Sequence, residues 1–465
     1  MAIKFDIEMP NSKFAISNVD RRPQYLEIYN LMNKKEEMVE EKIKYGKNDF
    51  PIGFASPNFS INNMIVVNIN AVEKEQGEVS RKSKVFGIVG RKGSGKSVML
   101  GMIADYYKLR FNVPIFILDP FGEFYVKRST FAYDKSDEYQ NYVDDFLESI
   151  NEKRIAYKNL LVICPLFMKG NSDANIDKFF TISFKNIKLI MKYDKMEAVS
   201  LLIDLLGITN NDSNADLIFS TIASRSINSW SELLIALKDE SKATKGKASV
   251  IFSRIRTRLN ANIISDDDTH YLNILEELST RDMVVMKAQL RQTLDDDYIT
   301  AIYNAYVKII ITTIRLDLQH QGEDNYLTNP QGIFLGIDEI DSVAPAVGTS
   351  SLRITITQLA SKFRKAMINL GMATQSISKV DPTLFQQCNF VLTPKLEKDN
   401  SILISYFNIS DEWINILSNL KKGVKTNLNT IVSEFAVINL DTPDLTKRIR
   451  IFYPSIPLSA IYSRG

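Results

Sequence analysis

The feature that most constrains this chain is the glycine-rich segment 90–97, which reads GRKGSGKS. It fits the pattern G-x-x-x-x-G-K-[ST] in full, the pattern of a loop that holds phosphate groups. An apolar run typical of a strand precedes it at 84–89, and a helical pattern follows it at 98–111. A strand, a glycine-rich turn and a helix in this order direct backbone N–H groups and the positive end of the helix dipole at a phosphate. The sequence therefore predicts a nucleotide-binding P-loop rather than an ordinary polar turn.

Two side chains of this loop have distinct expected tasks. Lys96 is expected to reach the β- and γ-phosphates of ATP as a mobile point charge, and the Ser97 hydroxyl is expected to bind Mg²⁺. The helix is expected to begin near Ser94. The expected nucleotide-binding residues are Gly90, Arg91, Lys92, Gly93, Ser94, Gly95, Lys96, Ser97 and Val98.

A pair of acids, Asp338 and Glu339, closes the apolar run GIFLGIDE at 332–339. Asp338 at the end of a strand is expected to take part in the Mg²⁺ site, and Glu339 is expected to polarise the attacking water. Taken alone, such a pair is usually a turn or a helix cap. The segment DEID resembles the DExD motif of superfamily 2 helicases. However, its long separation from Lys96 and the lack of a second arginine-rich motif argue against that class.

Two further candidates follow expected strands. Glu123 lies in DPFGEF after the strand 113–120, where ligands of open parallel sheets bind, so it can approach the γ-phosphate or its water. The alternative there is a Pro-Gly turn that merely ends the strand. Gln375 follows the strand 368–374, and its amide can sense the γ-phosphate or orient water; an ordinary polar residue is the alternative.

The order of elements predicts an α/β fold. The strand 84–89, the helix 98–111 and the strand 113–120 form a βαβ unit, which is typical of a doubly wound, predominantly parallel sheet. Four parts are expected: an N-terminal helical leader at 1–50, the first part of the core at 51–125, a helical insertion lobe at 126–280, and the second part of the core at 281–465. The leader contains an expected helix at 24–46, and the lobe contains expected helices at 140–155, 176–206 and 248–260.

Composition limits the classes of partner. The chain of 465 residues is 45% hydrophobic and 24% charged, as globular proteins are, and its net charge is only +2. Contact with nucleic acid therefore requires local basic patches. The densest basic stretch comprises Lys242, Lys245, Lys247, Arg254, Arg256 and Arg258, and a second candidate is Lys421 with Lys422. A solvated or salt-bridged face is the alternative for the first stretch. Two cysteines and two histidines indicate no disulfide framework or zinc motif.

The chain shows no sign of export or membrane insertion. The first residues contain acids and no apolar signal region, and the most apolar stretch, near Ile309–Ile314, is bracketed by Lys308 and Arg315. That stretch is far shorter than the roughly 18 apolar residues that a membrane span needs. We therefore expect no membrane span and a cytoplasmic location.

Together, GRKGSGKS, LDPFGEF, GIDEIDSVAP and ATQSISKVDPTLFQQCNFVL resemble the HerA/FtsK superfamily of P-loop ATPases over about residues 50–455. The resemblance is strongest to the HerA branch and its VirB4/TraG-like conjugation relatives. It implies a RecA-like core, a homo-hexameric ring, ATP with Mg²⁺ at subunit interfaces and double-stranded DNA in the pore. It supports catalytic roles for Lys96, Glu339, Glu123 and Gln375. It also implies a trans-acting arginine finger at Arg364, with Arg353 in reserve.

The function implied by this resemblance is an ATP-driven DNA translocase in DNA processing, conjugative transfer or genome packaging. The region before the P-loop is shorter than the β-barrel usual in the HerA branch, so a nuclease partner is in doubt, and a secretion or packaging partner stays open. One alternative is a nucleotide-dependent assembly switch that does not move DNA. Another is a P-loop kinase or GTPase, but the sequence contains no N-K-x-D guanine motif and no LSGGQ-like signature.

Overall fold

The computed structural model describes most of the chain from Asp49 to Ser463. It leaves out the termini 1–48 and 464–465 and the segments 58–63, 69–71, 76–77, 82, 123, 127–147, 149–156, 158, 170–175, 209–211, 242–246, 289–296, 321–325, 347–350, 362–366, 396–408, 410, 426–430, 442–448 and 455–460. The expected leader helix 24–46 and nearly all of the expected helix 140–155 therefore lie outside the described residues. The same holds for two predicted site residues, Glu123 and Arg364.

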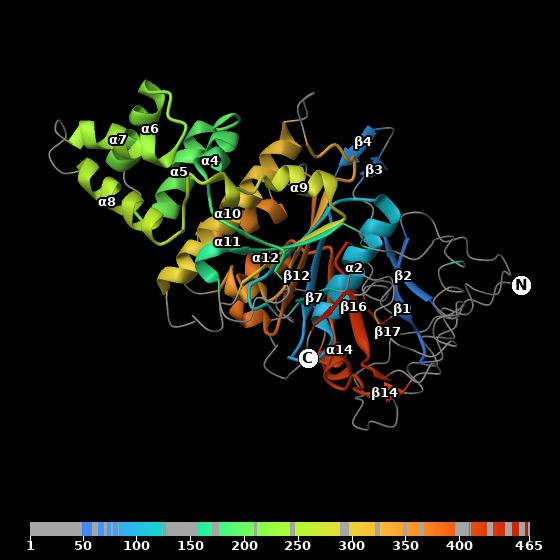
Figure 1. Cartoon of the computed structure of the whole chain (residues 1–465). Helices are drawn as coiled ribbons and strands as arrows, with labels where there is room; N and C mark the ends of the chain where they lie inside the picture. Colours follow the sequence, from blue (N-terminus) through green and yellow to red (C-terminus); the bar gives the residue numbers. More distant parts are fainter. Residues whose placement is uncertain are drawn as a thin grey trace, which may run out of the picture.

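One sheet organises the described residues (Figure 1), and twelve of the described strands form it. Its order is β2 (Met64–Asn68), β1 (Asp49–Phe54), β17 (Ile449–Pro454), β16 (Phe435–Asn439), β13 (Phe390–Thr393), β5 (Val85–Val89), β12 (Ile368–Thr374), β11 (Ile333–Ile337), β6 (Ile115–Asp119), β10 (Met283–Lys287), β8 (Leu160–Pro165) and β9 (Lys178–Phe180). From β13 to β9 all neighbours are parallel, whereas β16, β17, β1 and β2 join antiparallel. The predicted α/β fold with a predominantly parallel sheet is confirmed.

The central strands are apolar throughout because helices cover both faces of the sheet. All five residues of β5, β6 and β11 are buried. On one face, Phe86 and Ile88 pack in one cluster with residues of α2 (Lys96–Phe111). On the other face, Val85 and Val89 belong to the cluster formed with α10 (Asp297–Gln319), α11 (Ser351–Ser361) and α12 (Pro382–Gln386).

A group of helices follows β9 in the chain and lies to one side of the sheet (Figure 1). Its members are α4 (Phe184–Met191), α5 (Lys195–Leu206), α6 (Asp212–Ser224), α7 (Trp230–Ser241) and α8 (Lys247–Asn260), and α9 (Ile274–Thr280) leads back to β10. Two ion pairs join α5 to α10: Lys308 Nζ lies 2.5 Å from Asp204 Oδ2, and Arg315 pairs with Glu197. Because α10 also packs on the sheet, it connects this helical group to the core.

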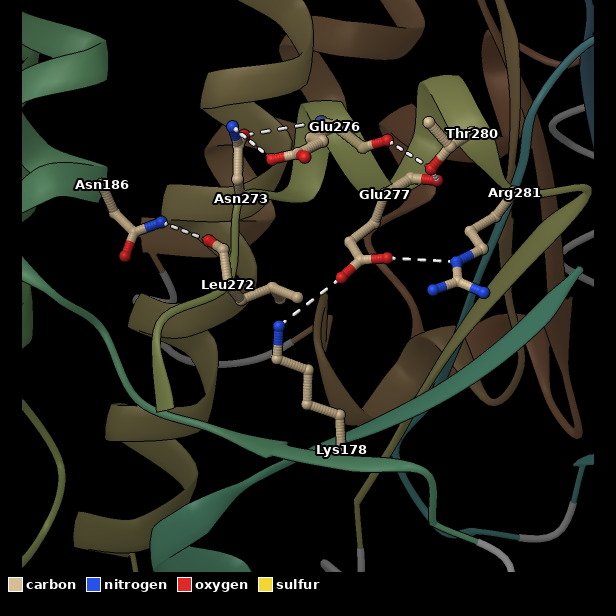
Figure 2. A network of polar contacts seen from close by, with 8 residues as sticks. All are labelled: Lys178, Asn186, Leu272, Asn273, Glu276, Glu277, Thr280 and Arg281. Atoms are coloured by element: carbon tan, nitrogen blue, oxygen red, sulfur yellow. Dashed lines mark hydrogen bonds and ion pairs between the residues drawn. The ribbon is translucent and has the colours of Figure 1, made fainter. Parts of the chain in front are cut away.

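A polar network fastens α9 to the edge strand β9 (Figure 2). Glu277 Oε1 lies 3.5 Å from Lys178 Nζ of β9, and Glu277 Oε2 accepts a hydrogen bond of 3.2 Å from Arg281 Nε. The Asn186 amide of α4 donates to the Leu272 carbonyl at 2.8 Å. The returning chain is thus held at both α4 and β9 before it re-enters the sheet as β10.

The remaining described elements are short. They are the pairs β3 (Val72–Glu75) with β4 (Glu78–Arg81), β7 (Phe124–Val126) with β18 (Ile461–Ser463) and β14 (Val424–Lys425) with β15 (Ile431–Val432), the helix α14 (Asp411–Ser418), and the 3₁₀ turns η4 (Leu166–Met168), η5 (Asp268–His270), η7 (Ile340–Ser342) and η9 (Ile377–Lys379).

The single helix expected at 176–206 is wrong. The segment begins as β9 and then forms two helices, because Ser183 caps α4 in a capping box with Asn186 and the Asp194 side chain accepts from Glu197 N to cap α5. Gly207 ends α5 in the left-handed conformation, directly after residue 206, where the helix was expected to end.

The expected helical range 126–280 also contains two strands of the main sheet, β8 and β9. The run LLVICP of β8 is fully buried beside β10, so the core extends into this range. The range 126–280 is therefore not wholly helical, although α4 to α9 give its second part the expected helical character. Its boundaries as a domain stay a prediction.

Among the described helices, α10 is long and apolar enough to cross a membrane by length and composition. It is mostly buried inside the protein, as the core helix of a globular fold is. This is weak evidence for a span, and it does not conflict with the expectation of none.

Candidate nucleotide site

The P-loop has the backbone that a phosphate cradle requires. Gly93 and Gly95 have φ angles of +75° and +92°, which a residue with a Cβ adopts only with strain. Helix α2 begins at Lys96, slightly later than expected, and no side chain caps its start. Its first N–H groups are thus left for a ligand, and anions are favoured there by the helix dipole. Arg91 and Lys92 are exposed, whereas Gly90, Ser94, Lys96 and Ser97 are buried and Val98 is half-buried.

The order of the strands brings distant segments to this loop. Strand β12 lies between the P-loop strand β5 and β11, and β6 flanks β11 on the other side. These strands are parallel, so their carboxyl ends share one edge of the sheet. Gln375 follows β12, Asp338 and Glu339 follow β11, and Asp119 is the last residue of β6.

Ser97 and Asp338 form the part of the site that suits a divalent cation. Ser97 Oγ donates a hydrogen bond of 2.8 Å to Asp338 Oδ2, and both residues are buried. Asp338 Oδ1 is buried with no hydrogen-bond partner among the described residues. A hydroxyl and a carboxylate oxygen are ligands that Mg²⁺ prefers beside nucleotide phosphates, so these two predicted metal residues fit the ion.

Lys96, Glu339 and Gln375 meet beside this pair. Lys96 Nζ lies 3.6 Å from Glu339 Oε1 and donates to the Arg91 carbonyl at 3.4 Å. The Gln375 amide donates to the same Glu339 oxygen at 2.9 Å. Glu339 Oε2 is buried and has no partner among the described residues. The structure thus brings the three predicted residues together, and the Gln375 amide contacts the carboxylate that was expected to polarise water.

Glu339 is held in an unfavourable backbone conformation. Its φ is +52°, in the left-handed region that residues other than glycine seldom adopt. Such strain persists only where surrounding contacts enforce it, and it occurs most often at functional sites. Here the 3₁₀ turn η7 follows directly, and Ser342 N and Oγ both donate to the Glu339 carbonyl.

Asp119 is a further acid of this site, to which the sequence analysis gave no role. Phe124 N donates to Asp119 Oδ2 at 2.8 Å, and Asp338 N donates to the carbonyl of Leu118, so the ends of β6 and β11 are adjacent. Burial raises the pKa of Asp338 to about 7, and the negative charge of Asp119 adds to that rise. The available signal was the same as for Asp338, an acid that ends an apolar strand.

Other candidate residues lie away from this cluster or are held elsewhere. Arg353, the reserve finger, forms an ion pair with Asp381 at 3.4 Å and donates to the carbonyls of Pro345 and Ala346, so it binds within its own chain. Lys421 and Lys422 are exposed. Glu123 and Arg364 lie outside the described residues, and their roles stay predictions.

Comparison with protein families finds a match for part of the chain, which includes the P-loop but not the acids after β11. Residues 80–280 match the family model described as the central domain of the helicase HerA. The match includes the P-loop and ends before β11. Over these residues the chain is therefore similar to the HerA central domain, in agreement with the resemblance to the HerA branch. A comparison with curated proteins found no match.

Three solved structures are among those to which this chain is similar. VirB4 of Thermoanaerobacter pseudethanolicus is 12% identical, with 89% of this chain and 97% of that chain covered and a TM-score of 0.49. The genome packaging NTPase B204 of Sulfolobus turreted icosahedral virus 2, in complex with ATP-gammaS, is 11% identical, with coverage of 80% and 98% and a TM-score of 0.34. Plasmid coupling protein TrwB, in complex with ADP and Mg²⁺, is 12% identical, with coverage of 82% and 83% and a TM-score of 0.40. At these scores the likenesses carry no conclusion about activity.

The Lys96–Glu339 contact predicts an effect on nucleotide affinity. Glu339→Gln removes the charge that holds Lys96, so ADP should bind more tightly in the absence of Mg²⁺. The gain should be about fivefold, or about 1 kcal/mol, because desolvation offsets most of the attraction within a buried ion pair. The measurement is titration with a fluorescent ADP analogue in EDTA.

The matched control is Asp341→Asn, which removes a nearby charge that bonds to Thr374 Oγ1 rather than to Lys96. If both variants gain affinity equally, general charge repulsion explains the gain and the specific Lys96–Glu339 restraint is absent.

The raised pKa of Asp338 predicts a pH-dependent stability of the nucleotide-free protein. An unfolded Asp titrates near pH 4. The folded protein therefore keeps this proton up to about pH 7, and stability falls as pH rises through that window. Asp338→Asn cannot ionise, so it should melt at a higher temperature than wild type at pH 8 and lose most of that advantage at pH 5. An advantage of equal size at both pH values would contradict the perturbed pKa.

Proposed function

We propose that this protein is an ATP-driven DNA translocase of the HerA/FtsK type, and that it works as a homo-hexamer. The observation that carries the proposal is the convergence of Lys96 and Ser97 of the P-loop with Asp338, Glu339 and Gln375 at one edge of a parallel sheet. The match of residues 80–280 to the HerA central domain supports the choice of this class among P-loop proteins.

The contacts of the site residues suggest a different role for each of them. Lys96 would leave Glu339 and neutralise charge on the β- and γ-phosphates of ATP. Ser97 and Asp338 would hold Mg²⁺, which would supply further positive charge beside the phosphates. Glu339, whose Oε2 is buried without a hydrogen-bond partner among the described residues, accepts a proton from the attacking water. Gln375 orients the Glu339 carboxylate through its amide hydrogen bond. Glu123 near the γ-phosphate and Arg364 as a finger from a neighbouring subunit complete the proposal.

The biological role that we propose is also that of a HerA/FtsK-type motor. A motor of this kind takes double-stranded DNA as partner and serves DNA processing, conjugative transfer or genome packaging, with a nuclease, secretion or packaging protein as a further partner. A cytoplasmic location remains the expectation.

The test is ATP turnover with and without double-stranded DNA, with the oligomeric mass measured in parallel by light scattering. We expect DNA to raise turnover in a salt-sensitive manner, a mass close to six times 52.9 kDa, and no turnover in Lys96→Ala. Salt sensitivity is expected because phosphate contacts release counterions. If the oligomer binds DNA but its rate of ATP turnover does not change, the result would favour a nucleotide-dependent assembly switch instead of a motor.

A further inference from the structure

Helix α8 lies in a stretch of the sequence that contains basic residues and no acidic ones. The sequence 241–265 contains Lys242, Lys245, Lys247, Arg254, Arg256 and Arg258 and no acid, although acids make up 55 of the 465 residues of the chain. Within this stretch the structure assigns different surroundings to the three arginines. Arg254 and Arg256 are exposed, whereas Arg258 is buried.

Arg258 anchors the helix rather than offering charge to a partner. Its Nε donates to the Leu205 carbonyl at 3.0 Å, and its guanidinium lies 4.4 Å from the ring centroid of Tyr298 and bonds to the Tyr298 hydroxyl. Of the three arginines in the predicted basic stretch, Arg258 is therefore not part of an exposed basic face. These contacts fix α8 to the end of α5 and the start of α10, so its outer face is presented on a rigid support.

The two exposed arginines flank a strip of small side chains. Each residue turns the helix by about 100°, which places Arg254 and Arg256 on nearly opposite margins of the exposed arc. The exposed residues between them are Ser249, Val250, Ser253, Thr257 and Asn260. Within the described part of the chain, neither arginine has a hydrogen bond or an ion pair. Because both side chains are exposed, their charges can reach a ligand.

This arrangement matches the two phosphate strands beside a major groove. A helix with its side chains is about 10–12 Å across, and the major groove of B-form DNA is about 12 Å wide. Small residues along the middle let the helix enter the groove, while a long, permanently charged arginine on each side reaches the phosphates of one strand. The narrow major groove of A-form RNA would exclude the helix, and a single strand offers only one row of phosphates.

We propose that α8 binds duplex DNA by lying in its major groove, with Arg254 and Arg256 on the two backbones. The proposal rests on the proposed DNA motor function and deepens it. Because α8 lies at the outer end of the helical group, away from α2 and the P-loop (Figure 1), it provides a DNA contact that is separate from the nucleotide site.

The test is fluorescence anisotropy of the full-length protein with a short labelled duplex DNA, without nucleotide, over a series of salt concentrations. Arg254→Ala/Arg256→Ala should weaken binding and lower the slope of log affinity against log salt by about two, because each lost phosphate contact removes about 0.9. Lys188→Ala/Lys195→Ala, which removes the same charge from exposed positions on α4 and α5, should leave the slope near that of wild type.

A second variant tests insertion rather than charge. Ser253→Phe adds bulk to the exposed strip without changing charge, so it should weaken duplex binding while leaving the salt slope and the affinity for single-stranded DNA unchanged. Two results would overturn the groove assignment while the motor function stands. One is a wild-type salt slope in Arg254→Ala/Arg256→Ala, and the other is an equal loss of duplex and single-stranded DNA binding in Ser253→Phe. Absence of duplex binding by the wild-type protein would overturn the motor function as well.

Discussion

The proposed site depends first on the contact between Lys96 and Glu339. Opposite charges from two separate segments meet where both side chains are almost fully buried, so their attraction is strong but their loss of water is costly. Gln375 offsets part of that cost by donating to the same carboxylate oxygen. A nucleotide phosphate is the ligand that can replace Glu339 beside Lys96 without leaving a buried charge alone. Binding would then release the carboxylate, for which we propose the role of polarising water.

The contact between Lys96 and Glu339 depends on how helix α2 packs against the sheet. Gly336 of β11 and Gly371 of β12 are register partners, and α2 crosses above them. A Cβ on Gly371 would lie 2.7 Å from Leu100 Cδ1 of α2, whereas one on Gly336 would lie 2.5 Å from Ile117 Cδ1 of β6 and 3.5 Å from Leu100 Cδ1. Gly371 therefore leaves room for the Leu100 side chain where α2 packs against the sheet. From the start of this helix, Lys96 and Ser97 contact Glu339 and Asp338, which follow β11.

The parts of the fold that the sequence predicted well are those that depend on local sequence patterns. The P-loop, β12 and α10 depend on short motifs and apolar runs, and they lie close to where they were expected. Features that depend on tertiary neighbours were not readable. The Gln375–Glu339 bond requires β12 beside β11, and the burial of Arg258 requires Leu205 and Tyr298 to meet it. The caps Ser183 and Asp194 were available signals, but the apolar pattern on both sides concealed the break.

The decisive measurement is a crystal structure of the protein with ADP and Mg²⁺. We expect Lys96 Nζ to leave Glu339 Oε1 and contact the β-phosphate, while Ser97 Oγ turns from Asp338 to the cation. Gln375 should keep its hydrogen bond to Glu339, whose carboxylate then faces the γ-phosphate position. A nucleotide bound with the Lys96–Glu339 contact still in place, or bound away from the P-loop, would contradict the account.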